Sequence, residues 1–513
     1  MKTAHQLNLY KLMSQFVNNS FFRLSLLEKK EWQGLIVIMM VSSALRLHSN
    51  FSTEYMPGNN GAFYLVMLRG LLEKGTLVIK DFPLLFWLEA GIAFIPYKLG
   101  LAGMNASIDM TSRIFDSIVP VLSIIPAYLL VKKILLNKKE FTTAIVFASI
   151  SILYFSFLVL ISDFQKNSLG LLWLFWLVYY LHSVHEKPIT KNYLFMFLFL
   201  VLAGLTHYGC FAVAITVVVL DILVNYSLRL NLKKFIKAFI VSITIAAVCI
   251  GLVFLINKWR AEIFIRIPLD IFNDPILFPL LKGKPVLSPF EIFNMVLVNI
   301  SAVVGFAVYI NNYRVIENPL RSFILSMILL SLFLSSPMLN VDAALRVYFI
   351  SYLTALPLIP FIYNFISSKR KKGIYIFLVV SVIILSIISV ESKKQQSNMN
   401  ENIYSEMTEI QKHLPDNSRT VIVARHGMEF WSMWIFRIDA VRQELLTKSY
   451  WNWYKSVIFL IQKKETSQFG PAGLYGPQYP QPTVPPQCFL IYRSAFFDLY
   501  KSPSPPDDMS IFQ

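Results

Sequence analysis

Long apolar runs dominate residues 1–390 of this chain. A membrane-spanning helix needs roughly 17 to 25 mostly apolar residues, and about eleven runs satisfy that requirement. Together they predict a polytopic α-helical membrane protein. The runs begin near Gly34, Thr111, Phe141, Ser168, Tyr193, Cys210, Phe239, Phe293, Arg321, Arg346 and Ile374.

The basic residues between these runs predict the orientation. Every second loop is basic, and the positive-inside rule assigns such loops to the cytoplasm. We therefore expect a cytoplasmic N-terminus in the plasma membrane, which is the inner membrane in a bacterium. With an odd number of spans, residues 391–513 are extracytoplasmic. The basic loops carry Lys132, Lys133, Lys138 and Lys139; Lys187 and Lys191; Arg229, Lys233, Lys234 and Lys237; Arg314 and Arg321; and residues 369–372.

Composition supports this class and excludes others. The chain is 56% hydrophobic and 15% charged, which is too apolar for an ordinary soluble protein. Its net charge of +17 fits cytoplasmic loops held against anionic lipid better than nucleic-acid binding. The sequence contains no Walker loop or dinucleotide fingerprint, so no nucleotide cofactor is expected.

Residues 391–513 differ in character from the rest. One amphipathic helix and three short strands are predicted there, with a Gly/Pro-rich stretch at Gly470–Gln487 before the last strand. A segment of this length can form a small extracytoplasmic α/β domain. The helix is predicted at Ile403–His413 and the strands at Thr420–Ala424, Ser456–Gln462 and Cys488–Tyr492.

The first outer loop, at about 49–110, is long and only half polar. Ala62–Glu73 and Leu84–Leu99 carry apolar residues at helical spacing, which predicts two interfacial helices along the membrane.

Charged and titratable residues that are far apart in sequence fall at or near the outer side of this topology. Polar groups at a membrane boundary are costly unless they are satisfied, so their convergence predicts a functional site. The residues are Glu54, Asp81, Asp163, His207, Asp342 and Arg346.

Two motifs in the first outer loop resemble a known enzyme family. Residues 60–64 (NGAFY) are followed by Arg69, and residues 80–87 read KDFPLLFW. This layout resembles the protein O-mannosyltransferase and lipid A aminoarabinose transferase superfamily of GT-C glycosyltransferases. Its motifs are D-E-x-x-Y with an arginine five residues later, and then E-K-P-P-L-x-Y-W. Here Asn60-Gly61 replaces the acidic pair, and Asp81 replaces the lysine.

The resemblance implies an inverting glycosyltransferase. Such an enzyme moves a sugar from a polyprenyl-phosphate-linked donor to a lipid, glycan or protein acceptor at the outer face of the membrane. The chemistry needs a general base for the acceptor proton and cations, or a metal, for the departing phosphate.

Three carboxylates are predicted to be catalytic. Glu54 follows the first span and is the first candidate for the base, although a solvated loop carboxylate is an equal alternative. Asp81 could be the base or could cap the following helix. Asp163 could orient the base, bind a metal or cap a span. Arg425-His426-Gly427, after a predicted strand, is a weaker candidate, because polar loop residues are common there.

Six further residues are predicted to bind substrate. Arg346 is the strongest phosphate candidate, and the alternative is a helical pair with Asp342. His207 could instead be a packing residue, Lys166 could extend to the interface, and Arg69 could anchor lipid headgroups. A divalent metal shared by Glu54, Asp81 and His207 is a further hypothesis. The substrate-binding set is Arg346, His207, Lys166, Arg69, Tyr64 and Asn60.

Two other functions remain open at the sequence level. An O-antigen polymerase or ligase would need large outer loops rich in arginine, and the loop near Arg346 is short. A lipid or polysaccharide flippase would need ionisable residues at mid-bilayer and a structural repeat, and neither is evident in the sequence.

Overall fold

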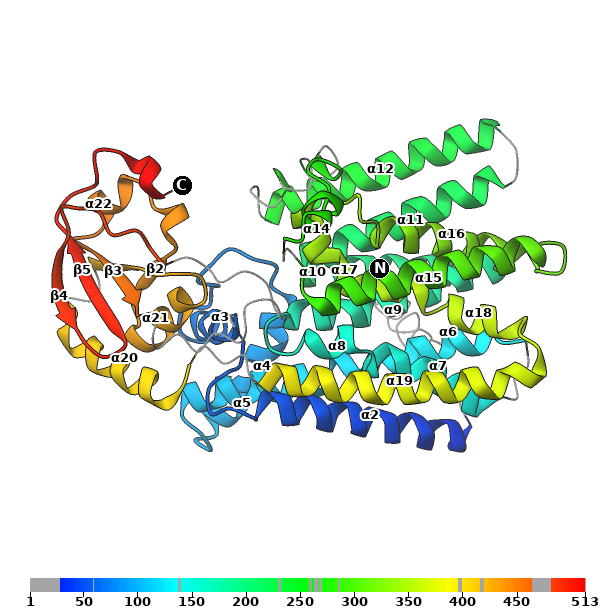
Figure 1. Cartoon of the computed structure of the whole chain (residues 1–513), viewed down its shortest axis with the longest axis horizontal. Helices are drawn as coiled ribbons and strands as arrows, with labels where there is room; N and C mark the ends of the chain where they lie inside the picture. Colours follow the sequence, from blue (N-terminus) through cyan, green and yellow to red (C-terminus); the bar gives the residue numbers. More distant parts are fainter. Residues whose placement is uncertain are drawn as a thin grey trace, which may run out of the picture.

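The computed structural model describes residues 28–58, 60–136, 140–228, 232–256, 258, 261–262, 266, 270–284, 287–394, 399–415, 419–463 and 481–512. These residues form a helical bundle and a small α/β domain at one end of it (Figure 1). Helices α3 (Gly61–Lys74) and α4 (Leu84–Lys98) lie where the two parts meet. Residues 1–27 and most of the Gly/Pro-rich stretch lie outside the described residues.

Every predicted apolar run begins inside, or at the start of, a bundle helix. The mostly helical architecture is therefore confirmed. The bundle helices are α2 (Lys29–Asn50), α5 (Met104–Ile118), η2 (Pro120–Ser123), α6 (Ile124–Ile134), α7 (Phe141–Leu153), α8 (Phe155–Val159), α9 (Gln165–Glu186), α10 (Thr190–Thr206), α11 (Tyr208–Ser227), α12 (Leu232–Ile256), α14 (Leu277–Leu281), α15 (Pro289–Asn311), α16 (Asn318–Leu334), α17 (Val341–Ala355), α18 (Leu358–Asn364) and α19 (Ser368–Lys394).

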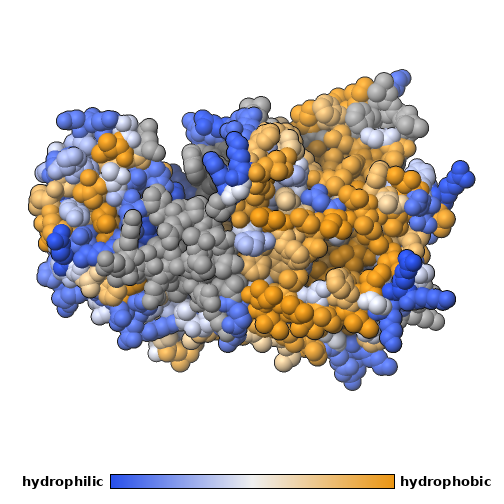
Figure 2. Space-filling view, in the orientation of Figure 1, coloured by the Kyte–Doolittle hydropathy of each residue, from blue (hydrophilic) through white to orange (hydrophobic). Residues whose placement is uncertain are grey.

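Six helical segments in the described part of the chain are long and apolar enough to cross a membrane. The total of eleven spans stays a prediction. Figure 2 shows apolar residues spread over the bundle surface, whereas the α/β domain is largely polar. The six segments are Met104–Ile134, Phe141–Val159, Tyr208–Ser227, Pro289–Asn311, Val347–Asn364 and Lys369–Glu391; shorter apolar helices are Thr190–Thr206, Phe239–Leu255 and Asn318–Leu334.

The C-terminal domain is built on a five-stranded mixed sheet with the order β2-β1-β3-β5-β4. Strand β1 is parallel to both β2 and β3, and β5 is antiparallel to β3 and β4. The predicted helix and the three predicted strands are present, whereas β2, β5 and α21 were not predicted. The elements are α20 (Glu401–His413), β1 (Thr420–Val423), α21 (Met428–Phe436), β2 (Asp439–Val441), η4 (Gln443–Leu445), α22 (Ser449–Trp453), β3 (Ser456–Gln462), β4 (Phe489–Arg493), β5 (Phe497–Ser502) and η6 (Met509–Phe512).

Both helices predicted in the first outer loop are present, but their surroundings differ. α3 is buried along most of its length and contacts α21 of the C-terminal domain. α4 instead keeps one exposed apolar face, where Trp87 and Ile95 are each more than half exposed. The first outer loop therefore joins the two parts of the molecule through α3 and presents an apolar surface through α4.

Candidate active site

Asp163 lies in a tight turn between α8 and α9. Ser162, just before it, adopts a left-handed conformation with φ of 66°. The Ser162 amide donates to Asp116 Oδ2 at 3.0 Å, and its hydroxyl donates to the Pro57 carbonyl. A left-handed serine costs of order 1 kcal/mol or more, and such conformations cluster at functional sites. The turn therefore fixes where the Asp163 carboxylate points.

The loop before α3 closes directly onto that carboxylate. The backbone N–H of Asn60 donates to Asp163 Oδ1 at 2.8 Å, and the Tyr64 hydroxyl donates to the Asp163 backbone carbonyl at 3.3 Å. Gly58 has φ of 86°, and a Cβ there would lie 2.3 Å from Asp163 Oδ1. Asn60 and Tyr64, predicted to bind substrate, are thus found holding Asp163. The side chain of Asp163 makes no cap on α9, whose N-cap residue is Phe164.

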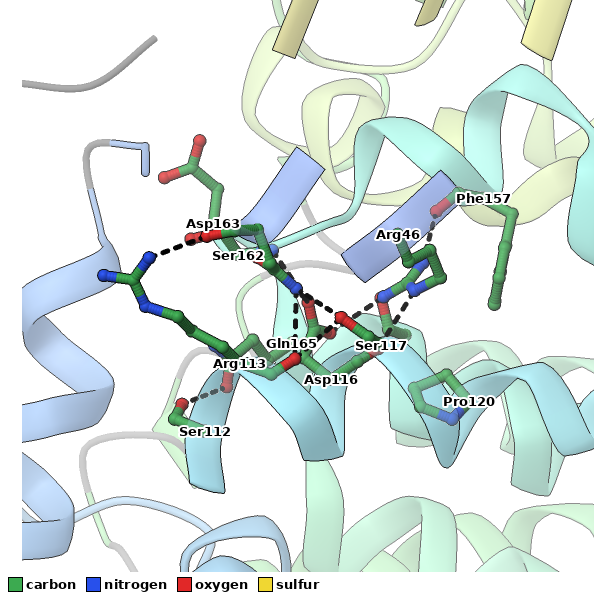
Figure 3. A network of polar contacts seen from close by, with 12 residues as sticks. Arg46, Ser112, Arg113, Asp116, Ser117, Pro120, Phe157, Ser162, Asp163 and Gln165 are labelled. Carbon is green, nitrogen blue, oxygen red and sulfur yellow. Dashed lines mark hydrogen bonds and ion pairs between the residues drawn. The ribbon is translucent and has the colours of Figure 1, made fainter. Parts of the chain in front are cut away.

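A buried ion pair between Arg46 and Asp116 supports this turn (Figure 3). Arg46 Nη2 lies 2.8 Å from Asp116 Oδ1, and both side chains are fully buried. Arg46 also donates to the carbonyls of Asp116 at 2.9 Å and Phe157 at 3.1 Å. Asp116 in turn accepts from Asn50 Nδ2 at 3.1 Å and from the Ser162 amide. One carboxylate therefore ties α2, α5 and the Asp163 turn together.

A second arginine fixes the loop that carries Glu54. Arg113 donates to the backbone carbonyls of Asn50 at 2.8 Å, Thr53 at 2.9 Å and Glu54 at 2.6 Å. Glu54 itself is exposed. Glu54, the predicted base, therefore lies on a loop whose backbone is fixed. At the end of this loop, the backbone of Asn60 contacts a different carboxylate, the buried side chain of Asp163.

Asp81 and Lys166 form a second buried pair at the same end of the bundle. Lys166 Nζ donates to Asp81 Oδ2, and the Phe82 amide donates to Asp81 Oδ1 at 2.8 Å. The rings of Phe63 and Phe86 lie 5.3 and 5.8 Å from Lys166 Nζ. Asp81 therefore pairs with a cation and makes no cap on α4, whose N-cap residue is Pro83.

The structure brings together Asp163, Lys166, Asp81, Asn60 and Tyr64. It places His207 in the turn between α10 and α11, with its ring 4.7 Å from that of Tyr208. In the described residues no group of three or more His, Cys, Asp or Glu side chains could hold a metal ion. The suggested set of Glu54, Asp81 and His207 does not assemble into a metal site.

The backbone of Arg346 belongs to α17, as does that of Asp342, and both side chains lie outside the described ones. Their roles stay predictions.

Arg69 contacts the C-terminal domain. It donates to the carbonyls of Trp434 at 2.7 Å and Met433 at 2.5 Å, in the last turn of α21, and lies over the Trp434 ring. A cation is favourable at a helix C-terminus because unpaired carbonyls and the helix dipole are negative there. This geometry favours a role in joining the two parts of the molecule.

Arg69→Met should loosen that contact without unfolding the bundle. Two charge-assisted hydrogen bonds are lost, so we expect faster amide hydrogen exchange in α21 and unchanged exchange in α7. Hydrogen exchange followed by mass spectrometry measures both helices in one sample. Arg437→Met is the control, because Arg437 pairs with Glu73 at the same junction at 3.6 Å but is exposed. Equal exchange in the two variants would rule out the role in docking.

Glu89 was not predicted from sequence. It lies on α4, outside the candidate spans, and is fully buried. Neither carboxylate oxygen has a hydrogen-bond partner in the structure described here. Burial, and secondarily the charge of Asp116, raises the pKa of Glu89 well above its usual range. An ionised carboxylate without partners is costly in such a place, so Glu89 is held neutral.

Glu89→Gln should therefore raise stability at neutral pH. The Glu89 carboxyl is neutral in the folded chain, but in the unfolded chain it ionises at its ordinary pKa of about 4.3. The free energy of unfolding of the wild type therefore falls as the pH rises above that value. The amide cannot ionise, and its advantage should be absent near pH 4 and grow towards pH 8. Thermal unfolding across that range measures it, with Glu401→Gln on exposed α20 as control. An advantage that is constant with pH would contradict a neutral Glu89.

Comparison with known proteins identifies the fold but no sequence family. No protein-family model and no curated protein sequence matches the chain. Among solved structures, the oligosaccharyltransferase of Archaeoglobus fulgidus in the apo form has a TM-score of 0.58 at 11% identity, covering 83% of this chain and 69% of that one.

Two further solved structures are similar to this chain. The A. fulgidus enzyme AglB in complex with an inhibitory peptide and a dolichol-phosphate has a TM-score of 0.51 at 12% identity, covering 84% of this chain and 69% of that one. Cupriavidus metallidurans ArnT bound to undecaprenyl phosphate has a TM-score of 0.49 at 10% identity, covering 94% and 100%. The two A. fulgidus similarities cover more than four fifths of this chain, so the chain has the fold of the archaeal oligosaccharyltransferase.

Proposed function

We propose that this chain transfers a sugar from a polyprenyl-phosphate-linked donor to a lipid, glycan or protein acceptor at the outer face of the plasma membrane. The observation that carries the proposal is the pair of polar centres at one end of the bundle, Asp163 in its strained turn and Lys166 with Asp81. The fold supports it, because the similar archaeal enzyme binds dolichol-phosphate in one of its complexes.

Lys166 is proposed to hold the donor phosphate. It lies in the first turn of α9, where the helix N-terminus also favours an anion. Asp81 keeps the ammonium group in place and compensates its charge before the donor arrives. When a phosphate binds, Lys166 can share its donors between the two anions, since an ammonium group has three.

Asp163 is proposed to be the base of an inverting, single-step displacement. The acceptor oxygen attacks the anomeric carbon while its proton passes to the Asp163 carboxylate. The bond from the anomeric carbon to the phosphate oxygen breaks, and its electron pair leaves with the lipid phosphate. Lys166 stabilises that growing charge. Glu54 remains the alternative base, because its carboxylate is exposed on the adjoining loop.

The lipid tail would remain in the bilayer beside α4. This helix begins three residues after Asp81 and exposes Trp87, Ile92 and Ile95 on one face. Such an apolar face is favourable in lipid and costly in water. A donor with its phosphate at Lys166 could therefore keep its polyprenyl chain along α4. The positive-inside pattern supports the outer side for this end and a cytoplasmic N-terminus.

Donor consumption by the purified protein tests the proposal. A panel of radiolabelled polyprenyl-phosphate sugars is incubated with a membrane lipid and glycan extract as the source of acceptor, together with wild type, Asp163→Asn, Lys166→Met or Glu54→Gln. We expect wild type to consume at least one donor and Asp163→Asn to be slower by about a hundredfold or more. Glu409→Gln, on exposed α20, is the control. Consumption of no donor overturns the function, and loss only in Glu54→Gln moves the base to that residue.

A further inference from the structure

The sheet of the C-terminal domain has a crossover at β1. The chain leaves β1 through α21 to reach β2 on one side, and then crosses to β3 on the other, with all three strands parallel. In open sheets of this kind, ligands bind beyond the carboxyl ends of the strands where the connections diverge. Here that place is the loop 424–427 together with the ends of β2 and β3.

Polar side chains from all three strand ends meet there. Arg425 donates through Nε and Nη2 to Gln462 Oε1 at 3.0 and 2.7 Å. His426 Nδ1 lies 3.0 Å from Glu429 Oε1, at the start of α21. Arg442, just after β2, lies 3.1 Å from Glu444 and 3.9 Å from Glu429. Arg425 is buried, and this burial lowers its pKa to about 9.

Helix α21 also carries polar side-chain atoms that have no hydrogen-bond partner in the described part of the structure. All nine of its residues are buried. Even so, Glu429 Oε2, Trp431 Nε1 and Ser432 Oγ have no hydrogen-bond partner in the structure as described. Each such atom costs about 1 to 3 kcal/mol, and folded proteins keep few of them. A buried carboxylate with one unused oxygen, beside a histidine, is suited to binding a hydroxyl group.

This cluster faces the proposed donor site. The ring of Phe430, the residue after Glu429, lies 5.1 Å from that of Phe63. Phe63 in turn lies 5.3 Å from Lys166 Nζ. The His426 ring lies 6.0 Å from that of Phe430. Two aromatic rings therefore separate the His426–Glu429 pair from the ammonium group of the bundle.

We propose that the His426–Glu429 pair binds the acceptor, and that the acceptor is a carbohydrate hydroxyl. The inference rests on the proposed function, for which it names the acceptor side. The charges favour a neutral ligand over a phosphate, because both arginines are already engaged by protein groups and Glu429 would repel an anion. The ring of Phe63, which is only partly buried, provides an apolar surface on which the carbon face of a sugar can lie.

Binding and transfer test the inference separately. The probes are the methyl glycosides of glucose, galactose, mannose and N-acetylglucosamine, added to the full-length protein in nanodiscs. Saturation-transfer difference spectra measure binding without a donor. With a donor that wild type consumes, product formation gives KM for the glycoside and kcat. The variants are His426→Ala and Glu429→Gln, because the second keeps the size of a side chain that is almost fully buried.

The matched control is His413→Ala, because His413 faces Glu409 on exposed α20 of the same domain at 3.9 Å. We expect at least one glycoside to bind, and both variants to raise its KM by about tenfold or more, whereas His413→Ala leaves that KM at the wild-type value. If no glycoside binds, or if the variants match His413→Ala, the inference is overturned while the function stands. If wild type consumes no donor, the proposed function fails, and the binding spectra still decide whether the pair is a carbohydrate site.

Discussion

Gly58→Ala should abolish most glycosyl transfer while leaving the fold intact. A methyl group at this position would lie 2.3 Å from Asp163 Oδ1, so the carboxylate must move or the loop must retreat. Either movement also disturbs the bond from the Asn60 amide to the same oxygen. A displacement near 1 Å of a reacting group costs about a hundredfold in rate. We therefore expect kcat for the consumed donor to fall by about that factor.

Gly75→Ala separates this steric effect from backbone strain. Gly75 ends α3 with φ of 70°, close to the 86° of Gly58, and a Cβ there would meet nothing within 4 Å. Both variants therefore introduce a left-handed alanine, at a cost of about 1 kcal/mol, but only one pushes on Asp163. Steady-state kinetics and thermal unfolding are measured for both. Equal kcat values in the two variants would show that the position of Asp163 does not limit the reaction.

The bundle helices were predictable because the bilayer demands long apolar runs, and such runs are visible in sequence. Asp163, Asp81 and Lys166 were also predictable as residues that share one end of the bundle, since each interrupts or borders an apolar run. The pairing of Lys166 with Asp81 was not, because the two residues meet only through the packing of α9 against the loop before α4. The sequence therefore predicted that these residues lie near one another but not which contacts they make, and the side of the membrane on which they lie stays a prediction.

Other parts were hidden for physical reasons. Glu89 lies within an apolar helix, two residues beyond the KDFPLLFW motif, where a single carboxylate resembles a surface residue. α21 is apolar at all positions but Glu429 and Ser432, because it is buried between α3 and the sheet, so it lacks the alternation of polar and apolar faces that marks a surface helix. β2 has only three residues. These elements are defined by their neighbours, and that is why the face of the C-terminal domain towards the bundle emerged only in the structure.

Arg46→Met should be the most destabilising single change in the bundle. Arg46 is fully buried and binds Asp116 as well as two backbone carbonyls on different segments. Its removal leaves a buried carboxylate without its cation, which typically costs about 3 to 5 kcal/mol. We expect the thermal midpoint, followed by tryptophan fluorescence, to fall well below that of wild type. Because the Ser162 amide also depends on Asp116, donor consumption should fall as well.

A second substitution tests whether the uncompensated charge is the cause. Asp116→Asn in the Arg46→Met background removes the charge but keeps an oxygen that can accept from Ser162 and Asn50, so the midpoint should recover in part. Lys412→Met is the control, because its ion pair with Glu409 is similarly short at 2.5 Å but largely exposed, and surface pairs contribute little. No recovery in the double variant would mean that Arg46 acts through its backbone contacts to Phe157 and Asp116, and that the ion pair itself is not what holds the Asp163 turn.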